Sequence, residues 1–228
     1  MTYIITGYFG SGKTEFCVNL ALSLTAGDRG RSPLQGGVTI ADLDVINPYF
    51  RSREVAGKLA AHGITLTGDN LDLNTGQDLP AINLGFLSKI RAGERVIIDL
   101  GGGTSGARLL AACRDAILDA KAYEFLCVIN PFRPDMDTVD KIVEFVKSIN
   151  LSTNMAITGL VNNGNMLHHT TAEDVLQAQD LVAQAAAQLN LPVAYTLLQK
   201  NIYEQVHTKI ISNKILTFDK LQMRENWQ

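Results

Sequence analysis

The residues best suited to chemistry lie in a glycine-rich segment near the start of the chain. Residues 7–14 read Gly-Tyr-Phe-Gly-Ser-Gly-Lys-Thr and match the complete pattern G-x-x-x-x-G-K-[ST]. In this pattern the glycines let backbone N–H groups turn toward phosphate oxygens, the lysine reaches the β- and γ-phosphates, and the hydroxyl takes one Mg²⁺ position. Lys13 is then the expected catalytic cation and Thr14 a metal ligand. The predicted site for a nucleoside triphosphate comprises Gly7, Gly10, Ser11, Gly12, Lys13, Thr14 and Glu15.

Carboxylates follow two of the expected strands, at the points where those strands end. Asp42 and Asp44 close the run that begins at residue 37. Asp99 closes the run 95–99, and after Leu100 three glycines follow. Ligands of open α/β sheets lie at the carboxyl ends of the strands, so these acids are expected beside the γ-phosphate and Mg²⁺. A carboxylate in the position of Asp99 usually holds Mg²⁺ through a water molecule. An acidic turn is the alternative reading of Asp42 and Asp44.

The flanking segments supply the context that the glycine-rich motif needs. Strand-like and helix-like runs alternate along the chain, and runs such as 95–99 are apolar on both faces, as parallel strands covered by helices are. This alternation predicts an α/β fold, a doubly wound, mainly parallel sheet of about seven strands with helices on both faces, in a single domain over residues 1–228. The tail 208–228 reads as an edge strand or as a packing arm. Strands are expected at 2–6, 37–42, 64–67, 95–100, 123–130, 155–162 and 192–197, and helices near 14–26, 51–62, 79–91, 105–120, 135–149, 171–189 and 200–207.

Composition and charge narrow the function classes. Of the 228 residues, 46% are hydrophobic, and the net charge of −3 gives no electrostatic reason to expect nucleic acid or an anionic membrane as a partner. The start does not read as a signal peptide, and no stretch approaches the roughly 18 uninterrupted apolar residues of a membrane span. Cys17, Cys113 and Cys127 lie far apart in apolar segments, which favours buried thiols over a disulfide frame. We therefore expect a cytoplasmic protein.

Together these segments resemble the ParA/MinD class of P-loop ATPases, a group that includes the CobQ/CobB-type nucleotide-binding domains. The likeness rests on residues 12–14 with the helical run 18–21, on Ala-Asp-Leu-Asp at 41–44, and on Ile-Ile-Asp at 97–99 with its glycines, and it covers most of the chain. It implies a P-loop NTPase fold that binds ATP and Mg²⁺.

The resemblance also implies roles for the acids and for one glycine. Asp44 would orient the attacking water, Asp42 would support the metal site, and Asp99 with Gly102 would sense the γ-phosphate. One departure concerns the dimer. Dimeric members carry a signature lysine in the pattern K-G-G-x-G-K-T, and the matching positions here are Tyr8 and Phe9. This argues against carrying over the face-to-face ATP-sandwich homodimer.

The polar residues after the sixth expected strand bear on whether the nucleotide carries adenine or guanine. Guanine specificity usually comes from N-K-x-D, and the nearest string, residues 213–216, reads Asn-Lys-Ile-Leu without the acid. In the resembled family an asparagine at the end of the sixth strand lies against the adenine edge, and Asn162 and Asn163 occupy that place here. A turn is the alternative reading of the pair. After the fifth strand, Arg133 could bring charge to the phosphates, or belong to a helix-entry loop capped by Asp135.

The sequence thus favours a Mg²⁺-dependent ATP-binding protein, a slow ATPase that acts as a nucleotide-dependent switch for an unknown protein partner. The alternatives are a GTP-dependent metallochaperone, a small-molecule ligase of the dethiobiotin synthetase type, and a binding module that hardly hydrolyses. The metallochaperone lacks support from a Cys-Pro-His or His-rich patch. The ligase would need a pocket of substrate-binding basic residues near the second strand, where Arg51 and Arg53 alone are no convincing pocket.

Overall fold

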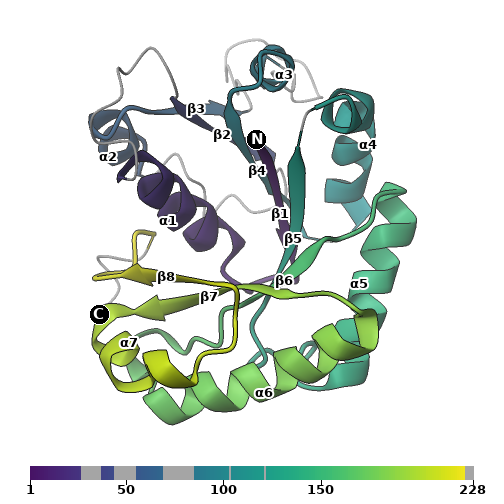
Figure 1. Cartoon of the computed structure of the whole chain (residues 1–228). Helices are drawn as coiled ribbons and strands as arrows, with labels where there is room; N and C mark the ends of the chain where they lie inside the picture. The colour runs from purple at the N-terminus through teal and green to yellow at the C-terminus, as the bar shows by residue number, and fades with distance from the viewer. Residues whose placement is uncertain (27–36, 44–54, 69–84, 103, 121, 224–228) are drawn as a thin grey trace, which may run out of the picture.

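A single eight-stranded sheet organises the chain (Figure 1). The computed structural model describes residues 1–26, 37–43, 55–68, 85–102, 104–120 and 122–223. The strand order is β3-β2-β4-β1-β5-β6-β7-β8, and neighbouring strands run parallel throughout the described sheet. The strands are β1 (Thr2–Gly7), β2 (Val38–Leu43), β3 (Ile64–Gly68), β4 (Arg95–Leu100), β5 (Tyr123–Ile129), β6 (Gly159–Asn162), β7 (Val193–Gln199) and β8 (Lys214–Phe218).

Helices cover both faces of this sheet, which confirms the predicted doubly wound architecture (Figure 1). One face carries α1 and α2, the other carries α3, α4, α5 and α6, and α7 packs with α6 beside β7 and β8. The helices are α1 (Lys13–Ala26), α2 (Ala56–Ala61), α3 (Phe86–Arg91), α4 (Thr104–Leu118), α5 (Val139–Thr153), α6 (Ala172–Leu189) and α7 (Lys200–Val206).

Strand β4 shows why the central strands are apolar on both faces. Successive side chains of a strand point to opposite faces, and here Val96 and Ile98 join the core under α3–α6 while Ile97 joins the core under α1. All three are fully buried. Burying a side chain of this size contributes about 1.5–3 kcal/mol, so the unbroken apolar run holds both helical layers on the sheet.

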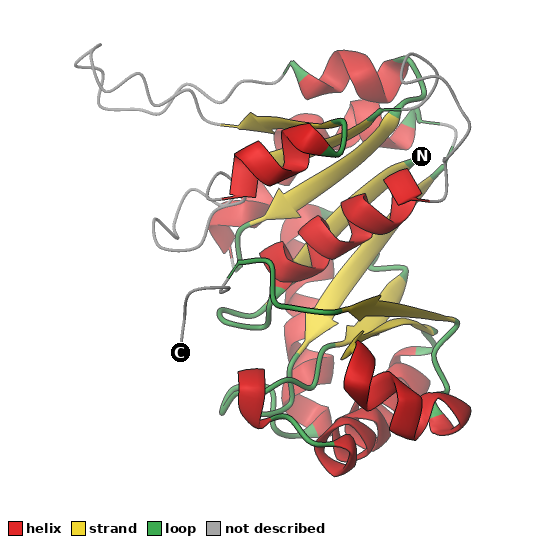
Figure 2. Ribbon diagram, turned by 90° about the vertical axis from the view of Figure 1, so that its left-hand side faces the viewer, coloured by secondary structure: helices red, strands yellow, loops and turns green. Residues whose placement is uncertain are grey.

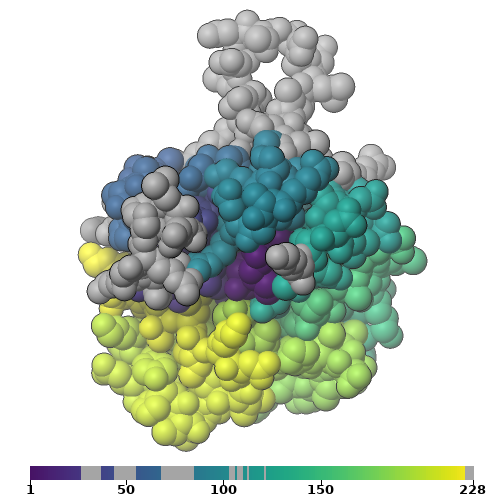
Figure 3. Space-filling view, turned by 45° about the horizontal axis from the view of Figure 1, so that its top comes forward, coloured from purple at the N-terminus to yellow at the C-terminus, as the bar shows by residue number. Residues whose placement is uncertain are grey.

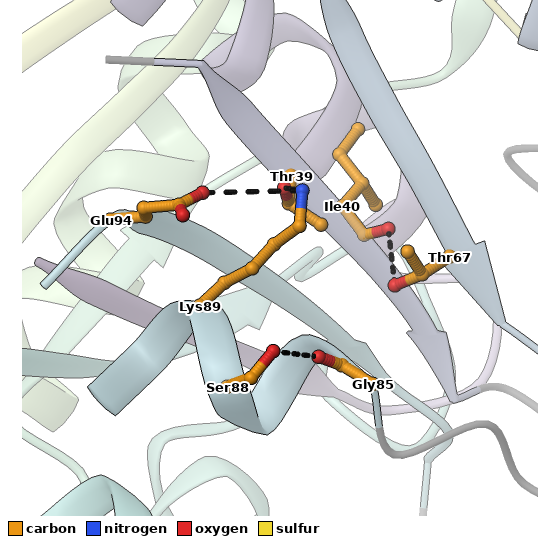
Figure 4. A network of polar contacts seen from close by, with 7 residues as sticks. All are labelled: Thr39, Ile40, Thr67, Gly85, Ser88, Lys89 and Glu94. Atoms are coloured by element: carbon orange, nitrogen blue, oxygen red, sulfur yellow. Dashed lines mark hydrogen bonds and ion pairs between the residues drawn. The ribbon is translucent and has the colours of Figure 1, made fainter. Parts of the chain in front are cut away.

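A polar network fixes the early part of β2, the strand that carries Asp42 (Figure 4). Lys89 of α3 donates from Nζ to Thr39 Oγ1 at 2.9 Å and lies 4.0 Å from the Glu94 carboxylate. On the other side of β2, the Thr67 hydroxyl of β3 donates to the Ile40 carbonyl at 3.5 Å. These contacts tie β2 to α3 and to β3 before the strand reaches its acidic end.

Several element boundaries differ from the sequence prediction. The tail forms β8 as an eighth, edge strand, where about seven strands were expected. β6 begins at Gly159, later than the expected residue 155, and α5 begins at Val139 because the Thr138 hydroxyl accepts from the Lys141 amide and caps the helix. The alternative in which Asp135 caps this helix is therefore wrong. The early parts of the helices expected at 51–62 and 79–91 lie outside the described residues.

The described chain begins at a central strand of the sheet, β1, and ends just after an edge strand, β8. The start of the chain, purple in Figure 3, reaches the surface beside the α3–α4 region. There the Met1 amino group donates to the Glu94 carbonyl at 3.3 Å. After β8, the chain crosses back to the first turn of α1 (Figure 2). Across the described residues, no helix has both the length and the apolar character needed to cross a bilayer.

Candidate nucleotide-binding site

The loop between β1 and α1 folds back on itself over its own lysine. The Ser11 amide donates to the Tyr8 carbonyl at 3.1 Å, and the same carbonyl lies 3.5 Å from Lys13 Nζ. The Phe16 amide then donates to the Gly12 carbonyl at 3.0 Å, which starts α1. Lys13 and Thr14 are both buried in the first turn of this helix. Backbone amides, a lysine and a hydroxyl therefore converge at a helix N-terminus, the arrangement that binds phosphate.

Two glycines of the loop adopt backbone conformations that other residues rarely take. Gly10 has φ +74° and Gly12 has φ +88°. A Cβ at Gly12 would also collide with the side-chain amide of Asn163, and one at Gly10 would lie 3.3 Å from Arg133 Nε. The glycines predicted from the motif are thus required by left-handed backbone and by close neighbours at once.

The two described acids lie side by side at the carboxyl edge of the sheet. Asp42 of β2 and Asp99 of β4 are register partners, and Asp99 is also the register partner of Ile5 in β1. Their side chains are 4% and 0% exposed. Each alternates in phase with Ile40 or Ile97, which pack under α1, so both carboxylates lie on the α1 face.

The pKa of the Cys17 thiol is affected by the charges of these acids. Complete burial raises the pKa of Cys17 well above its ordinary value, and the negative charge of Asp99, a hydrogen bond with Asp99 and the charge of Asp42 raise it further. The positive charge of Lys13 acts in the opposite direction. Cys17 is therefore a neutral thiol. Asp99, Asp42 and Lys13 therefore all lie close enough to Cys17 for their charges to act on its thiol.

Gly102 lies at the mouth of the loop. A Cβ there would be 3.0 Å from the Gly7 carbonyl oxygen and 3.6 Å from both Lys13 Nζ and the Phe9 amide nitrogen. The structure thus brings Gly102 next to the predicted phosphate site, and its role toward a γ-phosphate stays a prediction. Asp44, the predicted water-orienting residue, lies outside the described residues.

Metal binding at this place would depend on the nucleotide. Within the described part of the chain, no group of three or more His, Cys, Asp or Glu side chains comes close enough to hold a metal ion. Mg²⁺ commonly keeps several waters and is held by one or two carboxylates together with substrate phosphates. The donor set of Thr14, Asp42 and Asp99 fits that mode, since it offers one hydroxyl and two buried carboxylates.

Asn162 and Asn163 turn into the protein at the end of β6. Asn163 donates from Nδ2 to the Ser11 carbonyl at 2.7 Å, so it supports the phosphate loop from outside. Asn162 accepts from the Gly164 amide at 3.1 Å in a local turn, and its buried Nδ2 has no partner among the described residues. The loop contact of Asn163 was not predicted, and the adenine contact of the pair stays a prediction.

Glu15 makes a second contact that the sequence did not indicate. Its carboxylate accepts the backbone amides of Gln222 at 2.8 Å and Met223 at 2.9 Å, and the Asn19 side-chain amide at 2.7 Å. The tail is thus both an edge strand and a packing arm. No local pattern links residues 15 and 222, which is why this contact could not be predicted. Since the carboxylate is bonded to the tail, the nucleotide contact predicted for Glu15 would have to be made by its backbone.

Tyr8 occupies the position of the signature lysine and packs onto its own chain. Its ring meets Phe145 of α5 edge to face at 5.7 Å between centroids. Its hydroxyl is hydrogen-bonded to Asp135, which raises the pKa of Tyr8, with smaller contributions from burial and from the Asp135 charge. The neighbouring Phe9 is 64% exposed. Position 8 is therefore engaged with α5 rather than extended toward a second molecule.

The comparison with solved structures agrees with this architecture. In all, 38 chains of solved structures match this chain. One is the cell division protein FtsY of Thermotoga maritima, with a TM-score of 0.52 and 20% sequence identity over 86% of this chain. The match spans 60% of the FtsY chain, so less than two thirds of that protein is represented here. At this identity the likeness is one of fold alone.

The all-parallel sheet, the loop between β1 and α1 and this likeness lead to one conclusion. The chain has the P-loop NTPase fold. No protein-family model matches the sequence, and no curated protein is significantly similar to it. The finer likeness to the ParA/MinD class therefore rests on the sequence motifs.

Proposed function

We propose that residues 1–228 act as one nucleotide-binding domain that binds ATP with Mg²⁺, hydrolyses it slowly, and docks to a protein partner according to its nucleotide state. The observation that carries this proposal is the meeting of Lys13, Asp42, Asp99 and Gly102 at the carboxyl edge of three adjacent strands. A P-loop fold with this cluster supports nucleotide binding. The cytoplasmic location expected from the sequence belongs to the same proposal.

Phosphoryl transfer needs positioning and charge stabilisation more than covalent chemistry from the protein. In the proposed mechanism the loop amides and Lys13 hold the β- and γ-phosphates. Thr14, Asp42 and Asp99 would hold Mg²⁺, which would supply positive charge beside the phosphate oxygens. Asp44 would orient the attacking water. The close approach of Gly102 to Lys13 supports a role for its backbone beside the γ-phosphate, where binding and release could move the segment after β4.

The end of β6 supports adenine over guanine. In an N-K-x-D motif the carboxylate stands three residues after the asparagine, and the residues three positions after Asn162 and Asn163 are Asn165 and Met166. Neither can accept two hydrogen bonds from the guanine edge as a carboxylate does. We therefore assign ATP as the nucleotide.

The test is titration of the pure chain with ATP and with GTP, each with and without Mg²⁺, followed by measurement of phosphate release. We expect Mg²⁺-dependent ATP binding that Lys13→Ala weakens at least about 100-fold, since the charged contact to the β- and γ-phosphates is lost. Lys58→Ala on α2 is the matched control and should bind as the wild type does. A wild-type chain that binds neither nucleotide would overturn the proposal, and a preference for GTP would overturn the base assignment.

A further inference from the structure

The loop between β5 and α5 holds one arginine against the phosphate loop. The side chain of Asn130, 3% exposed, fixes this segment: its Oδ1 accepts the Phe132 amide at 3.1 Å and its Nδ2 donates to the Asn165 carbonyl at 2.9 Å. The Arg133 amide donates to the Asn130 carbonyl at 3.1 Å, and its carbonyl accepts the Met136 amide at 2.8 Å. The backbone of Arg133 is therefore bonded on both sides and presents its side chain from a fixed position.

The Arg133 guanidinium lies directly on Gly10. Its Nε donates to the Gly10 carbonyl at 3.1 Å. A Cβ at Gly10 would lie 3.3 Å from Nε, 3.5 Å from Cζ and 3.7 Å from Nη2. The guanidinium thus rests against a residue that forms the phosphate cradle, and Gly10 leaves room for it.

The positive charge of Arg133 has no neutralising carboxylate within the part of the chain that the structure describes. Among the described residues no carboxylate forms an ion pair with it, and the nearby Asp135 is hydrogen-bonded to the Tyr8 hydroxyl. The Arg133 side chain is partly exposed. Arginine presents five donors in a planar fork, and a single Nε contact leaves the others for an anionic ligand.

We propose that Arg133 is a second basic residue of the phosphate site, which holds Gly10 through Nε and binds the polyphosphate of the nucleotide through its remaining guanidinium nitrogens. This inference rests on the proposed nucleotide binding. Arg133 would also supply the second positive charge that Tyr8, in the position of the signature lysine, lacks. In the dimeric ATPases that the sequence resembles, a second cation reaches the nucleotide from the partner molecule, whereas here Arg133 would supply it from the same chain.

The competing role for Arg133 is purely structural, as a support for the loop. Two substitutions separate the roles. Arg133→Gln keeps an N–H donor for the Gly10 carbonyl and removes the charge, whereas Arg133→Lys keeps the charge and removes the planar fork. Lys147→Gln is the matched control, because Lys147 is exposed on α5 and its substitution changes the net charge equally.

The measurement is the dissociation constant of Mg²⁺·ATP by calorimetry, with the melting temperature of each nucleotide-free variant. Loss of a charged hydrogen bond predicts about 10- to 100-fold weaker binding by Arg133→Gln. Arg133→Lys should retain more of the affinity than Arg133→Gln, and Lys147→Gln should match the wild type. If Arg133→Gln binds ATP as well as or better than Arg133→Lys does, or no more weakly than Lys147→Gln, the proposal is overturned.

The order of the ATP affinities of Arg133→Gln and Arg133→Lys tests the role of Arg133 even if both variants melt at a lower temperature than the wild type. A wild type that binds ATP, with Lys13→Ala weakened and Arg133→Gln unaffected, refutes the role of Arg133 and leaves the proposed function in place. A wild type without affinity for either nucleotide refutes the proposed function itself. The two failures are therefore distinguishable in one set of titrations.

Discussion

The two sides of the phosphate loop are held in place by different means. On the side of β2 and β4, the polar residues are set by strand register, since Asp42 and Asp99 are direct partners in neighbouring strands. We call this the register side. On the other side, the loop is held by hydrogen bonds between residues far apart in sequence: Arg133 to Gly10, Asn163 to Ser11, and Gln222 to Glu15, which are 123, 152 and 207 positions apart. We call this the buttress side.

The two sides of the loop therefore have different roles: one places side chains beside the proposed phosphate site, and the other holds the loop in position. The register side supplies carboxylates and a glycine where charge would develop in phosphoryl transfer, and the rigid sheet fixes their spacing. The buttress side grips the loop by its carbonyl oxygens and by the carboxylate of Glu15. We infer that substitutions on the register side mainly change the proposed chemistry, whereas substitutions on the buttress side mainly change the stability of the loop. Arg133 is the buttress residue for which we also propose a contact with the nucleotide.

The largest effect on stability is expected where a buttress meets the loop most closely, at Gly12. Gly12→Ala forces a side chain into left-handed backbone, at about 1–2 kcal/mol, and displaces the Asn163 amide that donates to Ser11, at about 1 kcal/mol or more. We expect a loss of about 2–4 kcal/mol in the free energy of unfolding, measured by urea denaturation.

Gly63→Ala is the control for Gly12→Ala. Gly63 has φ +72°, and a Cβ there would meet nothing within 4 Å, so only the backbone cost of about 1–2 kcal/mol applies. If both variants lose the same stability, Asn163 contributes nothing as a buttress, and the distinction between the two sides weakens.

The same distinction explains how much the sequence could predict. Register-side residues follow from local patterns: a buried run such as 95–99 predicts its own strand, and its last residue is then placed at the sheet edge with no further information. Asp42 and Asp99 were placed in this way, as was the parallel sheet, whereas Gly102 was singled out by the family resemblance. The positions of strands in the order could not be read from any one segment.

The contacts of the buttress side could not be predicted from the sequence, because they join residues that only the folded chain brings together. Asn163 was singled out for a base contact, yet its amide donates to the loop, because only the three-dimensional structure shows that β6 ends beside Ser11. The tail carried no helical or strand period long enough to place Met223, which is nearly buried beneath the loop helix. Arg133 had two readings, and its contact with Gly10 depends on loop geometry that spacing does not encode.

A smaller effect on stability is expected at Glu15, where the C-terminal arm is held. Glu15→Gln keeps one acceptor oxygen but places an N–H₂ group against the backbone amide of Gln222 or of Met223. Losing a hydrogen bond to a charged group costs about 1.5–3 kcal/mol, so we expect a loss of about 2 kcal/mol in the free energy of unfolding.

Glu144→Gln provides the comparison, since Glu144 is exposed on α5 and should change stability by less than about 0.5 kcal/mol. Hydrogen exchange of the Met223 amide should also speed up in Glu15→Gln and stay slow in Glu144→Gln. Unchanged exchange in both variants would show that the arm is held by burial of Met223 and not by the carboxylate.

The smallest effect is expected at Tyr8, which ties the loop to the segment before α5. The hydrogen bond to Asp135 raises the pKa of Tyr8 above its ordinary value of 10.0. A raised pKa in the folded state means that this bond contributes stability fully below pH 10 and that the contribution is lost as pH rises through the folded-state value. The wild type should therefore lose stability above pH 10 slightly faster than Tyr8→Phe does, when melting temperatures are measured between pH 8 and about pH 11.

Tyr203→Phe on α7 is the reference for Tyr8→Phe, because the Tyr203 hydroxyl has no hydrogen-bonded partner among the described residues. It should leave the alkaline slope of the wild type unchanged. Equal slopes for all three proteins would mean that Tyr8 is held by its ring contact with Phe145 alone. The link between the loop and α5 would then be apolar, and the buttress side would depend on hydrogen bonds only at Arg133, Asn163 and Glu15.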